Sequence, residues 1–591
     1  MKKIITFKID NVNTISGGNF YLIDQWGGLD HKKHDSDNYV ANSYWSSKEN
    51  YYRTTIYMSG VLEKFVINLA NYLNDYHSEN KDVGYWKIIA SEWALYFLWQ
   101  VFNQWELLRK ISKDDECVFV LKNVIDKYRA PTCIDKHNFS NEDWNQLLFK
   151  DILDAMSKSN YEVIDYERHK SRTPSLRLSF LYQKFRRMAK KLKDSLSHRS
   201  KKSCDGALVI TNDLIGYFGV DADAANYFPF KVIIYQYDTF ISIKKSNKKR
   251  KISNRPSIKN AAALDEFESV LYKIAHNFIP HSLMEDRSKY LDLTQKLINL
   301  GRPKAICSSG LDYCDRWSYY LAALKEIDVP TYRYQHGGNY GIEKTFPFLS
   351  WEFDRYDTIL SWGRCYGHNT ISSFYKKPLN IEEIEREIDV LVVAYEPLLY
   401  RLGYNGMPLV IDPKIYETQI IDAIQVLVRN GFMRIVYKTR YYGDDEYGIS
   451  KRLCKSFTKI KIDKYTRAVE LIKKSKFVII TYLSTAFFEC LYENTPTVLY
   501  LNKDKDIVDE DIRSLFIEME LVGLVHWDIH SLDKFIASNK GMLHEWWTSD
   551  DLECVKKKII GLFAIPSANP FCDVINLVYR HSLSSHPEAP S

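Results

Sequence analysis

Closely paired cysteines and long apolar runs are missing from this sequence of 591 residues. Its ten cysteines are scattered without a Cys-x-x-Cys pair or a nearby histidine cluster, which argues for reduced thiols and against a disulfide or zinc framework. The most apolar stretch, Trp93 to Trp105, is too short and too rich in amide side chains to span a bilayer. We expect a buried helix there, with a helix resting on a membrane as the alternative. Lys8 and Asp10 interrupt the apolar run at the N-terminus, so we expect no signal peptide.

The chain also lacks a strong excess of one charge, because 81 Lys and Arg face 75 Asp and Glu. Any electrostatic signal must therefore be local. Two basic runs stand out, residues 184–203 and 244–259, and the second has no apolar periodicity. They are either solvated surface or segments attracted to an anionic membrane surface or a phosphate-bearing acceptor. No stacking or zinc motif accompanies them, so we expect no nucleic-acid partner.

Apolar periodicity predicts the organisation of the chain. Residues 51–110 repeat apolar side chains at three- and four-residue steps, which is typical of helices. From residue 206, short apolar runs alternate with helical patterns, and a second such series follows residue 387. This alternation predicts an α/β fold with two Rossmann-like domains facing a cleft and a helical elaboration on the N-terminal half. The predicted boundaries are 1–380, with a helical insertion at about 50–200, then 381–565, then a C-terminal segment at 566–591.

One stretch of the second series, Phe477 to Leu501, predicts a phosphate site. It reads as an apolar strand ending at Thr481, then Ser484 and Thr485 at the start of a helix, where free N–H groups favour an anion. Plain N-capping is the alternative. Glu489 lies four residues after Thr485 on the same helical face, where it could accept hydrogen bonds from the sugar hydroxyls of a nucleotide. A carboxylate among Phe and Leu side chains would otherwise be costly to bury.

Several segments in the same order, over about 530 residues, resemble one group of known enzymes. They are "HSENKDVGYWKIIASEWALYFLWQVFNQWE", "YQHGGNYG" with "LSWG", "YKTRYYGDDEYG", the strand-helix-strand stretch above, and "EWWTSDDLECVKKKIIGLFA". Together they resemble GT-B sugar transferases of bacterial surface-polysaccharide loci, including those of spirochaetes, which are related to CDP-glycerol-type polymerases. At residues 437–440 the chain reads Tyr-Lys-Thr-Arg, where that family is expected to read Arg-Leu-Tyr-Pro.

Position indicates further candidates for the site. His336 follows an apparent strand inside "QHGG", where Gly337 and Gly338 let the backbone approach a ligand closely. Its imidazole could take a proton from an attacking hydroxyl, or it could be a structural histidine. Asp24, next to Gly17 and Gly18 in what we expect to be the first strand-loop of the acceptor half, is the rival base.

The donor side of the predicted site is cationic. Lys438 and Arg440, at the end of a strand, are placed to neutralise donor phosphate, although both could equally be solvated. Thr481, Ser484, Thr485 and Glu489 complete the predicted donor-binding set. No Asp-x-Asp lies in a suitable strand-end setting, which disfavours the GT-A alternative.

The resemblance implies a metal-independent glycosyltransferase, with no cofactor, that works at the cytoplasmic face. It would move a sugar from a nucleotide sugar, in particular a CMP-activated nonulosonic or similar acid sugar, to a glycan or lipid-linked acceptor. A CDP-alditol phosphotransferase and a non-catalytic scaffold of a glycan-assembly locus are the alternatives. The pattern leaves open whether transfer inverts or retains the stereochemistry.

Overall fold

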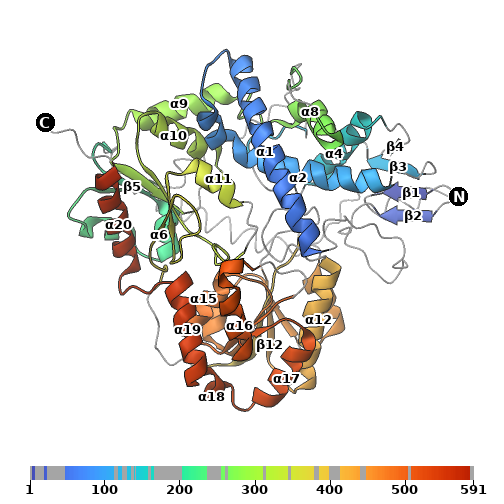
Figure 1. Ribbon diagram of the computed structural model, residues 1–591, viewed down its shortest axis with the longest axis vertical. Coiled ribbons are helices and arrows are strands. Elements are labelled where there is room, and N and C mark those ends of the chain that lie inside the picture. The colour runs from blue at the N-terminus through green and yellow to red at the C-terminus, as the bar shows by residue number, and fades with distance from the viewer. Residues whose placement is uncertain are drawn as a thin grey trace, which may run out of the picture.

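The computed structural model describes residues 3–6, 19–22, 47–111, 117–122, 129–134, 139, 141–157, 161–164, 203–235, 255–259, 264–309, 314–343, 348–377, 385–397, 413–439, 448–458, 460–502 and 508–585. These residues form two lobes (Figure 1). The N-terminal lobe carries the described residues up to 377, in blue to yellow, and most of the C-terminal lobe is orange and red.

A parallel sheet of six strands, in the order β10-β9-β8-β7-β5-β6, is the centre of the N-terminal lobe. Its strands are short and mostly buried. They are β5 (Leu208–Thr211), β6 (Val232–Tyr235), β7 (Ala305–Ser308), β8 (Thr331–Tyr334), β9 (Thr358–Ser361) and β10 (Thr370–Ser372). The helices of this lobe are α6 (Asn212–Phe218), α8 (Glu266–Phe278), α9 (Arg287–Ile298), α10 (Asp315–Glu326) and α11 (Phe348–Arg355).

The C-terminal lobe repeats this plan with six parallel strands in the order β13-β12-β11-β14-β15-β16. The strands are β11 (Ile388–Val393), β12 (Ile435–Lys438), β13 (Ile460–Asp463), β14 (Ser475–Ile480), β15 (Thr497–Tyr500) and β16 (Val525–His526). The helices are α12 (Pro413–Arg429), α13 (Ile449–Ser456), α14 (Ala468–Lys473), α15 (Thr485–Tyr492), α16 (Arg513–Leu521), α17 (Ile529–Asn539), α18 (Leu543–Trp547) and α19 (Asp550–Phe563).

Both sheets have the strand order of doubly wound folds, in which helices cover the two faces and ligands bind at the carboxyl ends of the strands. The predicted class, α/β with two Rossmann-like domains in a GT-B-like arrangement, is confirmed. The strands expected from the two apolar series form as β5, β6, β7, β8, β11, β12, β14 and β15.

The helical elaboration consists of α1 (Lys48–His77), α2 (Val83–Ile111) and α4 (Glu142–Ala155). Helix α2 packs against α1, α4, α10 and α11, so the stretch Trp93 to Trp105 is a buried helix, as predicted. Its amide side chains have a structural reason, because Gln100 and Gln104 donate hydrogen bonds to Asn145 Oδ1 over 2.6 and 2.7 Å. Buried polar groups need such partners.

The N-terminal half of the chain also forms a smaller sheet that the sequence pattern did not predict. Its four parallel strands follow the order β2-β1-β3-β4 and are β1 (Lys3–Thr6), β2 (Asn19–Leu22), β3 (Cys117–Lys122) and β4 (Tyr161–Ile164). The strand expected between Gly18 and Asp24 is therefore β2 of this four-stranded sheet. His336 follows β8, which belongs to the six-stranded sheet of the same lobe.

The last helix, α20 (Pro570–Ser585), returns to the N-terminal lobe, where Figure 1 shows it in red beside β5 and α6. Tyr579 stacks on Phe230 with ring centroids 3.7 Å apart, and the hydroxyl of Tyr332 on β8 lies 2.9 Å from the Nδ1 atom of His581. The predicted C-terminal segment is thus part of the N-terminal lobe's packing.

We predict that Ile575→Ala destabilises the N-terminal lobe, although Ile575 is near the end of the chain. Its side chain is fully buried, and truncation of a buried isoleucine costs about 2–5 kcal/mol. Leu583→Ala on the same helix is the control, because Leu583 is 43% exposed. Hydrogen exchange of β5 and β7 should accelerate for Ile575→Ala alone. Unchanged exchange in both strands would contradict the docking of α20 seen here.

Candidate functional site

Strand β14 leads into the predicted phosphate site through a short turn. Ser484 is the N-cap of α15, with extended backbone angles (φ −151°, ψ 167°), but its side chain makes no capping hydrogen bond. Its Oγ atom is buried and has no hydrogen-bond partner among the described residues. Thr481 has another role, because its hydroxyl donates to Val393 O over 3.1 Å and lies 2.6 Å from the Tyr416 hydroxyl. Thr481 therefore ties the end of β14 to β11.

Helix α13 of this lobe also has a start that could bind an anion, but the side chain of Glu396 occupies that place. The buried carboxylate of Glu396 accepts hydrogen bonds from the backbone N–H groups of Gly448, Ile449 and Ser450 over 2.7 to 3.1 Å. This carboxylate supplies the negative charge that the start of α13 favours. The start of α13 is thus filled by Glu396, whereas the N-cap side chain of α15 makes no hydrogen bond to the start of its helix.

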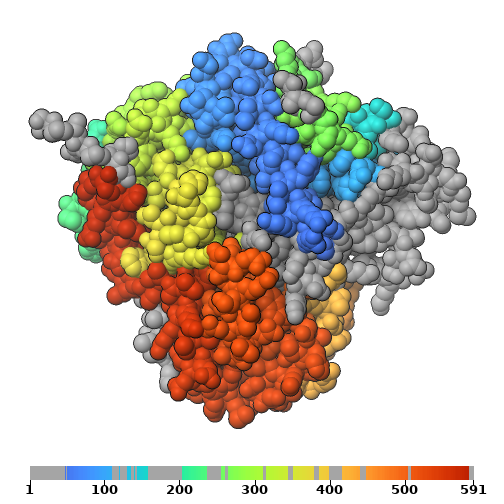
Figure 2. Space-filling view, viewed as in Figure 1, coloured from blue at the N-terminus to red at the C-terminus, as the bar shows by residue number. Residues whose placement is uncertain are grey.

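The loop after β8 meets the start of α15 directly. A Cβ atom built on Gly338 would lie 2.7 Å from the Ser484 carbonyl carbon and 2.8 Å from the Thr485 nitrogen. Only glycine fits a backbone approach this close. Farther along the loop, Asp509 N donates to Ile342 O over 2.8 Å, so the two lobes touch here as well. Figure 2 shows the yellow surface of the N-terminal lobe against the orange surface of the C-terminal lobe.

His336 lies in this loop and is exposed as a whole residue. The Nδ1 atom lies 3.0 Å from Arg333 Nη2 and 3.0 Å from the Tyr340 hydroxyl. The backbone carbonyl of His336 accepts a hydrogen bond from the Tyr217 hydroxyl over 2.9 Å. Both the ring and the peptide of His336 are therefore held from the side of the N-terminal lobe.

Glu489 faces the same region but has a cationic partner. Lys376, from the segment between the lobes, donates to Glu489 Oε1 over 3.2 Å, and its ammonium lies 4.7 Å from the ring centre of Tyr217. Burial, and then the Glu489 carboxylate, raise the pKa of Tyr217 well above its usual value. Glu489 is 9% exposed, so the ion pair with Lys376 accounts for its burial without any ligand. A role in nucleotide binding stays a prediction.

Lys438 ends strand β12, two strands away from β14 in the sheet. Its ammonium donates to Thr439 O over 2.9 Å and lies 3.8 Å from Asp463 Oδ1. Burial lowers the pKa of Lys438, and the charge of Asp463 opposes this shift. Arg440, Asp24, Gly17 and Gly18 lie outside the described residues, so their predicted roles stay predictions.

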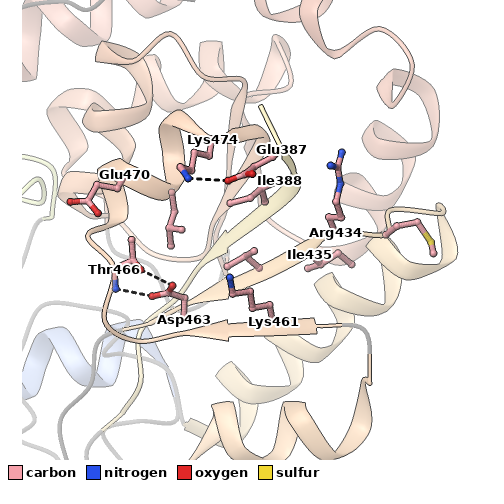
Figure 3. Close-up of a pocket in the computed structure, with 12 residues that line it drawn as sticks. Glu387, Ile388, Arg434, Ile435, Lys461, Asp463, Thr466, Glu470 and Lys474 are labelled. Carbon is pink, nitrogen blue, oxygen red and sulfur yellow. Dashed lines mark hydrogen bonds and ion pairs between the residues drawn. The ribbon is translucent and has the colours of Figure 1, made fainter. Parts of the chain in front are cut away.

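A pocket of about 600 Å³ opens on the C-terminal lobe (Figure 3). It lies between α14 and strands β11 to β13, and several of its charged groups have partners. Lys474 donates to Glu387 over 3.0 Å, and Asp463 accepts from the Thr466 backbone and hydroxyl over 2.9 and 2.8 Å. Asp463 also neighbours Lys438, so it joins this pocket to the predicted donor side.

The described residues contain no group of three or more His, Cys, Asp or Glu side chains that could hold a metal ion. No helix in this part of the chain combines the length and apolar character that a membrane span requires.

The structure thus brings Gly338 of one lobe, two residues after His336, next to Ser484 and Thr485 of the other. Reasoning from the sequence missed the residues that surround the site, which are Tyr217, Arg333, Tyr340, Glu352, Lys376 and Glu396. One signal was present, since Arg333 is a charged residue between two tyrosines in the buried strand β8.

The two lobes touch where the loop after β8 meets the start of α15. This arrangement defines a GT-B-like protein with a candidate site between its domains. A model of the LIC12162 family of transferases matches residues 8–576. The chain belongs to that family and is an enzyme of the transferase class. No curated protein matches it.

Solved structures resemble the chain only distantly. The MnaA–UDP co-structure from S. aureus has 12% identity and a TM-score of 0.38, covering 65% of this chain and 99% of that one. Spinosyn rhamnosyltransferase SpnG, complexed with spinosyn aglycone, has 10% identity and a TM-score of 0.32, covering 63% and 100%. Glycosyltransferase SnogD from Streptomyces nogalater has 10% identity and a TM-score of 0.32, covering 63% and 98%. Such low values indicate nothing about the chemistry of this chain.

We predict that Gly338→Ala separates the loop from α15. The added methyl group would meet backbone atoms that cannot rotate away, and overpacking of this kind costs about 1–3 kcal/mol. Gly337→Ala is the matched control, because its Cβ would first meet the Asn339 side chain, at 2.9 Å, which can move. Melting temperature and small-angle scattering should change more for Gly338→Ala. Equal effects of the two variants would contradict a specific contact between the lobes.

Proposed function

We propose that this transferase moves a sugar from a nucleotide-activated donor to a growing surface glycan or a lipid-linked acceptor, without a metal ion. The observation that carries the proposal is the contact of the 336–338 loop with the start of α15. Each of these elements follows the carboxyl end of a parallel strand, and doubly wound folds bind their ligands at that edge.

The chemistry of the helix start supports a phosphate-bearing donor. The N-terminal N–H groups of α15 and its dipole favour an anion, and the buried Ser484 hydroxyl adds a hydrogen-bonding group at the same place. A departing nucleotide gains negative charge in the transition state, so such a site stabilises the leaving group. The start of α13 is a poorer candidate, since Glu396 occupies it.

Within this function we favour a CMP-activated nonulosonic or similar acid sugar as donor, on the sequence resemblance alone. The test is incubation with a panel of nucleotide sugars and analysis of the released nucleotide. Slow release of CMP from CMP-activated acid sugars supports the favoured donor, and release of UDP alone overturns it. Transfer of an alditol phosphate from a CDP-alditol, or no nucleotide binding at all, would contradict glycosyl transfer.

We predict that turnover survives an excess of EDTA. The helix start, Lys438 and Arg440 are expected to supply the positive charge that a metal ion supplies in other transferases. The assay compares nucleotide release before and after chelation, with added Mg²⁺ or Mn²⁺ as the control. Complete loss of turnover that either cation restores would show that the reaction needs a metal.

We predict that Glu489→Ala weakens the binding of free nucleotide by about 1.5–3 kcal/mol, the range for a hydrogen bond to a charged group. Lys376→Met is the matched control, because it breaks the same ion pair but leaves the carboxylate in place. Calorimetry with CMP, CDP and UDP measures affinity, and thermal unfolding measures stability. If both variants lose stability while nucleotide affinity stays normal, Glu489 is only a structural partner of Lys376.

A further inference from the structure

The ring of His336 is held by two buried side chains of its own lobe. Arg333, on strand β8, is fully buried and places Nη2 3.0 Å from His336 Nδ1. Tyr340, four residues after His336, is 2% exposed and places its hydroxyl 3.0 Å from the same nitrogen. The Nδ1 edge of the ring therefore faces the interior of the lobe, although the residue as a whole is exposed.

The nature of these neighbours decides where the proton of the neutral ring lies. A guanidinium has only N–H donors and cannot accept a hydrogen bond. The bond between Arg333 and His336 therefore requires that Nδ1 accept, and a neutral imidazole with an accepting Nδ1 carries its proton on Nε2.

A third buried residue keeps both neighbours in place. The carboxylate of Glu352, on α11, is 1% exposed and accepts hydrogen bonds from the Tyr340 hydroxyl over 2.8 and 3.0 Å. Arg333 Nη2 lies 3.5 Å from the same carboxylate. Burial, and then the charge of Glu352, raise the pKa of Tyr340 well above its usual value. The phenol thus keeps its proton and donates a hydrogen bond to Glu352, so the decisive donor to His336 Nδ1 is Arg333.

We infer that His336 acts as a hydrogen-bond donor, through Nε2–H, to a phosphate oxygen of the departing nucleotide, and that Arg333 is the positioning residue that fixes this tautomer. Glu352 holds Arg333 and Tyr340 in place. The inference rests on the function proposed above. In this tautomer the one lone pair of the ring is already bound to Arg333, so the ring cannot take a proton from an acceptor hydroxyl. A group other than His336 then serves as the base.

The position of the loop fits this role. Gly338, two residues after His336, touches the first peptide of α15, the helix start expected to hold the phosphate. A neutral N–H donor beside the N–H groups at a helix start adds to the positive potential there. Such preorganised donors stabilise the negative charge that develops on the phosphate in the transition state. An imidazole acting as a base at this place would become a cation 3.0 Å from the Arg333 guanidinium.

Nuclear magnetic resonance tests the tautomer without any substrate. The full chain, labelled with ¹⁵N-histidine, gives long-range ¹H–¹⁵N correlations that distinguish protonated from unprotonated ring nitrogens, and loss of the signals in His336→Gln assigns them. We expect a protonated Nε2 and an unprotonated Nδ1 in the wild type and in Tyr340→Phe, which keeps Arg333. Arg333→Met should populate the Nδ1–H form. A protonated Nδ1 in the neutral wild-type ring overturns the inference, even if Arg333→Met fails to fold.

Binding and turnover test the role. The probe is whichever of CMP, CDP and UDP the wild type binds in calorimetry. His336→Ala should weaken that binding about tenfold, whereas His336→Gln, whose amide N–H replaces Nε2–H, should weaken it less than threefold. A general base predicts the reverse pattern, with normal affinity and a loss of turnover of about 10²–10⁴-fold in both variants, and that result overturns the inference. A wild type that binds no nucleotide would overturn both phosphate donation and the proposed function, but would leave the tautomer assignment standing.

Discussion

The backbone of Gly338 lies against the first peptide of α15 with no room for a side chain, and the arrangement of the two lobes depends on this contact. It sets the distance between the loop after β8 and the start of α15, and His336 lies in that loop two residues before Gly338. Helix α20 acts with it from the other side, because it belongs to the C-terminal end of the chain but packs on the N-terminal sheet. Between these two contacts, the lobes have little freedom to shift without losing buried packing.

Buried charges near this contact are paired, and the pairs join parts of the chain that are distant in sequence. Arg333 and Glu352 meet beneath His336, while Lys376 and Glu489 meet between the lobes. Pairs of this kind contribute little net stability, but removal of one partner leaves an uncompensated charge and is strongly unfavourable. Their effect is to select one arrangement. A nucleotide whose sugar hydroxyls donate hydrogen bonds to Glu489 would compete with Lys376 for the same carboxylate, so donor binding and the segment between the lobes are linked.

Local sequence patterns were enough for most of the regular structure. Alternating apolar runs predicted the central strands because parallel strands buried on both faces must be almost wholly apolar. The edge strand β13, with Lys461 and Asp463 on one face and isoleucines on the other, lacks that pattern and was missed. The strand next to Gly18 belongs to a separate small sheet, because strand pairing is a property of distant segments that no local pattern records.

The sequence by itself determined the two Rossmann-like series, the helix start at Ser484 and the strand-end loop with His336, because each depends on neighbouring residues. Only the tertiary structure decided what these groups can do. Glu489 acquires Lys376 as a partner from 113 residues away, and the start of α13 is filled by Glu396 from 52 residues away. The proton on His336 is placed by Arg333, which lies three residues earlier, but the guanidinium is held there by Glu352 of another element. Protonation and charge pairing depend on distances through space, which the order of residues does not contain.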